Sequence, residues 1–275
     1  MATWLLGPLG DLRELETPET GVVITEVRYG GVHQGLNGGR TMDVTGIKTE
    51  ITMNFEYLEE TDYRWLQALH TRHIPAQHRL INPMRKNRLT IPAASVNPSP
   101  ARRRPFFVTA GDTIWVSDWP VGPDPGNRSL RWYNRSGTSK AYFDGEKTCA
   151  VLPLEQVTVS VYLKAVAGFD MTLGIDWYDK DLVFISTSTS VSPVTTSWSR
   201  LSMTASAPVG AAVGRFSLES SSTNEVTIAA PQFEVGAVAT TWDQGGGDLS
   251  VLIDQMPANS PRFPLMNCSI TLLEA

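Results

Sequence analysis

The clearest pattern in the chain lies at residues 46–57, where apolar and polar side chains alternate. The apolar face would hold Ile47, Ile51, Met53, Phe55 and Tyr57, and the polar face Lys48, Glu50, Thr52, Asn54 and Glu56. A period of two over about eleven residues predicts a long antiparallel strand, buried on one side and solvated on the other. The β-branched segment 21–31 predicts another strand. The glycine-rich segment 35–44 between them predicts a turn or mobile loop.

A helix is predicted directly after the long strand. It would begin at Thr61, whose hydroxyl can cap the first turn, and end before Pro75, because proline cannot continue a helix. Its buried stripe would hold Trp65, Leu66 and Leu69. Residues 78–83 then predict a short strand that ends at a proline turn.

The rest of the chain is mostly strand-like. The proline-rich segment 90–105 predicts a linker or domain boundary. Residues 106–247 contain many short alternating segments separated by Gly, Pro, Asn or Ser, which is typical of a β-sandwich such as a jelly roll. The three glycines at 245–247 predict a second linker. Two further strands are expected at 248–257 and 266–275.

These last two strands need a sheet to join, because an isolated hairpin is at best marginally stable in water. The incomplete sheet of the N-terminal part is available. We therefore expect one mainly β domain formed by residues 1–104 plus 248–275, interrupted by an inserted β-sandwich at 105–247. The formal net charge of −5 falls on the insert, since the two outer parts together sum to zero.

Composition and motifs argue against several function classes. The acidic net charge excludes a wholesale cationic nucleic-acid binder, and no apolar run reaches the roughly 18 residues of a membrane span. His70, His73 and His78 are spaced by three and five residues, which does not suit a zinc-binding helix face. Asp176 and Asp179 could imitate a carboxylate pair, but turn formation explains them equally well. We expect no enzymatic activity and no required cofactor.

Two chemical roles stay open. A jelly roll can hold a structural calcium ion through oxygen ligands, but the sequence singles out no ligand set. Cys149 and Cys268 fit no metal or redox spacing, so buried thiols are favoured over a long-range disulfide.

Sugar recognition needs aromatic platforms beside polar groups, because CH faces stack on rings while hydroxyls need hydrogen-bond partners. The glycan-binding candidates are Trp119, which lies in a Pro- and Gly-rich loop, and Trp115, Trp132, Tyr133 and Tyr142. Core or boundary packing is expected for Trp177, Trp198 and Trp242. The charge run of Arg102, Arg103 and Arg104 is either a solvated stretch or a subunit-interface candidate that would pair with acidic groups of a neighbour.

The insert resembles the jelly roll of carbohydrate-binding modules. The matching stretches are GNRSLRWY (126–133), VTVSVYLKA (157–165), LGIDWYD (173–179), SWSRLSMTASAPVGA (197–211) and IAAPQFEVGAVATTW (228–242). The resemblance implies a sandwich fold and raises sugar binding as a function.

The outer parts resemble the tail-tube-like domain of bacteriophage distal tail and minor tail proteins. This resemblance is carried by the long strand 46–57, the helix 61–71, the RLINP turn at 79–83 and the closing strands 248–275. It implies a tail-tube-like β-sandwich or barrel with one helix, and a homo-oligomeric ring, expected to be a hexamer, that joins the tail tube to the tip.

The combined expectation is a structural virion protein of a phage tail tip or baseplate. Its partners would be copies of itself, the tail tube and tail hub proteins, and a host-surface polysaccharide contacted by the jelly roll. The alternatives are a glycan-binding adhesion module without a ring-forming role, and a tail tube protein with a decoration domain.

Overall fold

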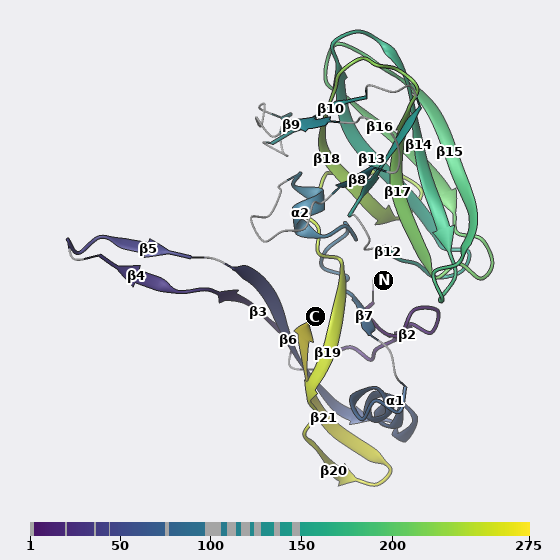
Figure 1. The fold of residues 1–275 in the computed structure, drawn as a ribbon. Coiled ribbons are helices and arrows are strands. Elements are labelled where there is room, and N and C mark those ends of the chain that lie inside the picture. Colours follow the sequence, from purple (N-terminus) through teal and green to yellow (C-terminus); the bar gives the residue numbers. More distant parts are fainter. Residues whose placement is uncertain are drawn as a thin grey trace. The chain divides into compact units, whose positions relative to one another are not determined.

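The computed structural model is mainly β (Figure 1). It describes residues 3–19, 21–35, 37–43, 45–74, 77–96, 106–108, 114–116, 122–123, 128–134, 138–144 and 149–275, with the backbone alone at 106–108 and 114–116. The chain divides into two compact units. Unit 1 comprises residues 1–80 and 249–275, and unit 2 comprises residues 81–248.

Unit 1 is built on one sheet that combines both ends of the chain. Its strand order is β2-β1-β7-β19-β21-β6-β3, with β20 paired to β21. The strands are β1 (Leu5–Gly7), β2 (Arg13–Glu14), β3 (Val22–Tyr29), β6 (Gly46–Leu58), β7 (His78–Ile81), β19 (Asp248–Gln255), β20 (Ala258–Arg262) and β21 (Leu265–Glu274). The expectation that the C-terminal strands join the N-terminal sheet is confirmed, since β21 pairs directly with β6. β20 was not expected.

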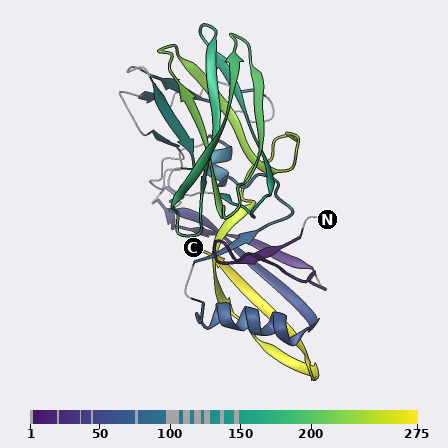
Figure 2. The ribbon, with the colours of Figure 1, turned by 90° about the vertical axis from the view of Figure 1, so that its right-hand side faces the viewer.

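The buried face of this sheet packs against helix α1 (Glu60–His70), which contacts β21 (Figure 2). The predicted stripe is confirmed, because Trp65, Leu66 and Leu69 are all buried. The predicted cap is wrong: the N-cap position is Glu59, and no side chain caps the helix there. Instead, the acidic side chains of Glu60 and Asp62 lie in the first turn, where their negative charge stabilises the positive end of the helix dipole.

The long strand keeps the predicted alternation only in its middle. Ile51, Met53 and Phe55 are buried as expected. Tyr57 has a φ of 60° and is exposed, and the pairing with β21 shifts there so that Leu58 is buried instead. An extra residue in a strand moves the following side chains to the other face, which a regular period of two does not foresee.

At its other end, β6 extends with β3 past the rest of the sheet. The last pair of β6 with β21 is at Glu50, and the chain beyond it forms a long hairpin that we call the arm, residues 26–49. At its tip β4 (Val32–Gln34) pairs with β5 (Arg40–Met42), so the expected loop is partly a regular hairpin (Figure 1).

Unit 2 is a β-sandwich. Among the described residues one sheet has the order β16-β13-β18-β10-β9, and the other has the order β15-β14-β17-β11-β8 with β12 on β17. The strands are β8 (Phe106–Val108), β9 (Ile114–Val116), β10 (Leu130–Tyr133), β11 (Ser139–Phe143), β12 (Cys149–Ala150), β13 (Gln156–Ala165), β14 (Phe169–Tyr178), β15 (Phe184–Val194), β16 (Ser199–Ser206), β17 (Val213–Ser220) and β18 (Val226–Val235).

The core between these sheets follows the alternation seen in the sequence. The inward side chains of β13 are Val157, Val159, Val161 and Leu163, and those of β14 are Met171, Leu173, Ile175 and Trp177; all are fully buried. Trp198 and Trp242 are half-buried. Both cysteines are buried, Cys149 in this core and Cys268 in that of unit 1.

The glycine linker and the described part of the proline-rich linker, residues 90–96, are packed segments of unit 2. Residues 90–105 were expected to form the boundary, yet unit 2 begins at Ile81, and the short helix α2 (Ile91–Ala94) lies in its core. The glycines at 245–247 are buried rather than linking. Gly246 N donates to Leu89 O (2.7 Å), and Gly247 N donates to Asn87 O (2.9 Å). A Cβ atom at Gly247 would lie 2.5 Å from Arg85 O, so this backbone approach requires glycine.

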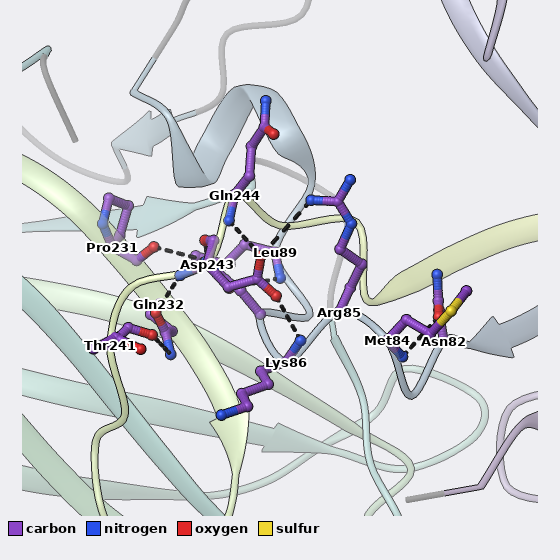
Figure 3. A network of polar contacts seen from close by, with 11 residues as sticks. Asn82, Met84, Arg85, Lys86, Leu89, Pro231, Gln232, Thr241, Asp243 and Gln244 are labelled. Atoms are coloured by element: carbon purple, nitrogen blue, oxygen red, sulfur yellow. Dashed lines mark hydrogen bonds and ion pairs between the residues drawn. The ribbon is translucent and has the colours of Figure 1, made fainter. Parts of the chain in front are cut away.

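We call the paired segments 82–90 and 241–248 the neck of unit 2. Figure 3 shows its polar contacts, which centre on Asp243: this carboxylate accepts the Lys86 N–H at 2.7 Å and lies 3.7 Å from the Arg85 guanidinium. Arg88 forms a buried ion pair with Glu155 at 2.7 Å. Backbone and side chains together therefore hold the entering and leaving chain of unit 2 side by side.

Candidate functional site

The two outward faces of the sandwich differ. Over the β13–β16–β18 sheet, the segment 236–243 packs closely. Thr240 donates from N and Oγ1 to the Glu234 carboxylate, and Arg200 donates to Thr240 O and to Ser160 Oγ. Glu234 and Ser160 are consequently buried. The segment 236–243 therefore covers this face, and the other sheet offers the more accessible surface.

The outward face of the other sheet carries a charged cluster around Asp176 of β14. The Asp176 carboxylate accepts hydrogen bonds from Lys140 Nζ (2.8 Å and 2.7 Å), from the Tyr142 hydroxyl (2.7 Å) and from Thr187 Oγ1 (2.7 Å). These groups come from β11, β14 and β15, and antiparallel pairing brings them to one face because cross-strand partners point the same way. We call Lys140, Tyr142, Asp176, Thr187 and Arg215 the Asp176 cluster.

The electrostatics keep Asp176 ionised. Burial opposes its charge, but the hydrogen bonds from Lys140, Thr187 and Tyr142 outweigh burial, and the pKa of Asp176 lies below its usual value. Burial, and then the hydrogen bond to Asp176, raise the pKa of Tyr142 far above its usual value, so this hydroxyl stays protonated and donates. The cluster is therefore a fixed set of donors around one carboxylate.

Cations stack on the ring of Tyr142. The Arg215 Cζ lies 3.8 Å from its centroid, and Lys140 Nζ lies 5.0 Å from it. Beside this ring the row continues with Ser217, Gly174 and Thr189, which are cross-strand neighbours. Among the described residues the Ser217 hydroxyl has no hydrogen-bond partner although it is buried. The middle of the face is thus lined by small side chains and holds an unused hydroxyl.

An aromatic pair lies two residues along β14 from Asp176. The rings of Tyr178 and Phe184 meet edge-on with centroids 5.8 Å apart, and Phe184 is 55% exposed. This exposed ring lies on the same sheet as the donors and acceptors of the Asp176 cluster. An apolar ring beside fixed polar groups is the combination that a saccharide requires.

The sequence candidates fall in different places. Trp119, Arg102, Arg103 and Arg104 lie outside the described residues, as does the side chain of Trp115 on β9. Trp132 was a wrong candidate: its inward position on β10 leaves it 1% exposed in the sandwich core, so its ring cannot serve as a surface platform. Its neighbour Tyr133 is half-buried on the same strand.

Tyr142 is brought into the cluster, but its ring is covered by cations and it acts as a hydroxyl donor. Asp179 is a turn former as expected, because its carboxylate accepts the N–H groups of Asp181 and Val183. Asp176 is not, since it lies within β14. Sequence reasoning missed Lys140, Arg215 and Phe184, although the outward positions of alternating strands signal the first two.

The described part of the chain contains no group of three or more His, Cys, Asp or Glu side chains that could hold a metal ion. His78 is buried and contacts Leu69 O at 3.3 Å. Among the described residues, no helix has both the length and the apolar composition that a membrane span requires.

No protein-family model matches the sequence, and no match was found among curated proteins. Solved structures show partial likeness. The enzymatically active domain of tailspike protein 4 from bacteriophage CBA120 has a TM-score of 0.39 at 12% identity, covering 48% of this chain and 19% of that chain. The CBM22-1 xylan-binding domain of Paenibacillus barcinonensis Xyn10C has a TM-score of 0.38 at 17% identity, covering 50% and 88%. A CBM4 structure has a TM-score of 0.35 at 14% identity, covering 48% and 86%.

Proposed function

We propose that this chain is a structural subunit of a bacteriophage tail tip that assembles with copies of itself, with unit 2 as an attached sandwich domain. The observation that carries the proposal is the arm. Every described residue from Arg28 to Thr45 is exposed, and the exposed side chains include Val32 (63%) and Ile47 (53%). An isolated two-stranded hairpin with exposed apolar side chains is marginal in water and is typical of an interaction site.

The sheet edge supports the same proposal. β3 is the last strand in the order of the unit 1 sheet. Among the described residues no strand pairs with its outer side, so the backbone groups there can pair with another chain. At the opposite end of that order β2 is exposed. Two different edges on one sheet can pair head to tail, and such heterologous contacts close into a ring when the rotation between copies allows. The resemblance of unit 1 to tail-tube-like domains favours a hexamer that contacts tail tube and hub proteins in the virion.

The test removes the outer part of the arm, residues 30–45, without disturbing the sheet. Tyr29 and Gly46 are cross-strand partners, so residues 30–45 can be replaced by an Asn-Gly turn. We expect the full chain to form a closed oligomer by light scattering and particle imaging, and the shortened chain to be monomeric. Val209→Ser, at an exposed apolar position of unit 2, is the control and should leave the assembly unchanged. A monomeric full chain, or a shortened chain that assembles normally, contradicts the proposal.

A second function, glycan binding by unit 2, is favoured by the Asp176 cluster and the exposed Phe184. We propose that a sugar ring stacks on Phe184 while its hydroxyls bond to the neighbouring Arg215 guanidinium. A glycan array with the full chain tests this. Phe184→Ala should weaken binding at least about tenfold, and Val166→Ala, an exposed position on the β13–β14 loop, should not. Trp119→Ala tests the sequence candidate in parallel. Equal binding by the Phe184 variant would exclude the Asp176 face.

We further propose that the chain has no hydrolytic activity on polysaccharides. The support is chemical: Asp176 already accepts hydrogen bonds from three side chains, and Asp179 accepts two N–H groups of its own turn. Neither carboxylate is poised as an acid or nucleophile. Turnover of any polysaccharide in a reducing-sugar assay would contradict this.

A further inference from the structure

The outer edge of β15 differs from an ordinary edge strand. β15 is the terminal strand of its sheet, and among the described residues no strand pairs with its outer side. It runs for 11 residues, Phe184–Val194, as FISTSTSVSPV. Soluble proteins usually protect such an edge with charges, bulges or a short strand, because open N–H and C=O groups recruit another strand.

That protection is nearly absent here. The segment 184–194 contains no charged residue. Its register with β14 is regular from Phe169↔Val194 to Trp177↔Ser186 and shifts only at the Phe184 end. Pro193 lies close to one end and removes one donor there. Phe184 and Val191 are exposed apolar side chains on this strand. The central part of the edge is therefore fully able to pair.

The order of side chains identifies the partner. If a second copy of β15 lies antiparallel about Thr189, the uncharged side chains of its central part face one another. The pairs there are Ser186 with Ser192, Thr187 with Val191, Ser188 with Ser190, and Thr189 with its own copy. A two-fold contact requires such self-complementarity, because the same patch serves both subunits. Charge repulsion, the usual obstacle to self-pairing, is missing.

We propose that β15 pairs edge to edge with β15 of a second copy, in antiparallel register centred on Thr189. This contact is separate from the arm and does not rest on the proposed assembly of unit 1. It joins the two outward faces into one continuous sheet, so that two Asp176 clusters face the same side. Rings formed through the arm would become paired rings, and copies without arm contacts would become dimers.

Cysteine crosslinking of the full chain tests the register. Thr189→Cys places two thiols directly opposite, within the reach of a disulfide, whereas Thr187→Cys places them four residues apart, about 13 Å along the strands. We expect Thr189→Cys to crosslink at least about tenfold faster than Thr187→Cys on a non-reducing gel. A mixture of Thr187→Cys with Val191→Cys should crosslink as a heterodimer. Because both native cysteines are buried, the unmodified chain is the blank.

A charge swap provides a second readout. Thr189→Lys alone and Thr189→Glu alone should each halve the assembly mass in analytical ultracentrifugation, because like charges face each other. Mixing the two variants should restore it, and Val166→Lys should have no effect. Slow crosslinking of Thr189→Cys, or unchanged mass in both charge variants, overturns the proposal. Loss of mass on arm removal with no effect at Thr189 would retain the proposed function and reject this contact.

Discussion

The buried ion pair of the neck gives the strongest stability prediction. Arg88 donates from both terminal nitrogens to the Glu155 carboxylate, at 2.7 Å and 2.9 Å, and also to Ala150 O at 2.7 Å. The two side chains are only 7% and 12% exposed. The same carboxylate accepts the N–H of Leu152. Glu155→Gln keeps the shape of the side chain and removes its charge.

The expected cost follows from burial. The variant leaves a guanidinium with a neutral partner in a nearly dry site, and removing one member of a buried pair typically costs about 3–5 kcal/mol. For a domain of this size each kcal/mol lowers Tm by about 2–4 °C, so the transition of unit 2 should fall by about 6–20 °C. The matched control is Asp181→Asn, which breaks the exposed Lys180–Asp181 pair of the same unit. Because both side chains of this pair are exposed to solvent, the control should leave the transition nearly unchanged.

Thermal unfolding followed by tryptophan fluorescence measures both variants, since Trp132 and Trp177 are buried reporters in unit 2. Unit 1 has its own core, so its transition should stay in place and serve as an internal reference. Equal shifts in Glu155→Gln and Asp181→Asn would show that the neck pair contributes no more than a surface contact, and would refute this reasoning.

Other predictions concern packing, pH and reactivity. Gly247→Ala should destabilise unit 2 by about 1–3 kcal/mol in urea, because its Cβ would meet Arg85 O, whereas Gly46→Ala has open space and should not. Burial lowers the pKa of His78, so the unfolded chain binds a proton first and unit 1 should lose stability as pH falls below about 6.5; His78→Gln should remove this dependence. Burial raises the pKa of Cys268 to about 11, so iodoacetamide at pH 8 should label it only after unfolding.

The sequence predicts most of the regular elements because their burial is one-sided. Ile51, Met53 and Phe55 on β6, and the alternating residues of β13 and β14, form cores wherever the sheet is regular. Prediction fails at Tyr57, where a local bulge reverses the faces, and at Thr61, because the N-cap is Glu59, two residues earlier than the hydroxyl suggests. The bulge and the helix start are both set by one or two residues, so no periodic pattern along the sequence signals them.

The linkers and the site were harder to predict for another reason. Gly247 is needed because the backbone oxygens of Arg85 and Asn87, distant in sequence, approach it, and Gly246 is needed because its φ is 86°. Composition alone cannot separate such a packed glycine from a flexible one. The Asp176 cluster depends on strand register, which brings Lys140 of β11 and Thr187 of β15 to one carboxylate. An aromatic residue such as Trp132 looks equally suited to a surface or a core until the inward face of its strand is known.

The pairing at the neck has a practical consequence for engineering. Asn82 N donates to Gly247 O at 2.9 Å, and the strands before and after these residues, β7 and β19, are neighbours in one sheet. A foreign domain whose termini are about one strand spacing apart could therefore replace unit 2 without distorting the pairing of β7 with β19. The same geometry would let a domain be exchanged at this position by design while the sequence of unit 1 stays constant.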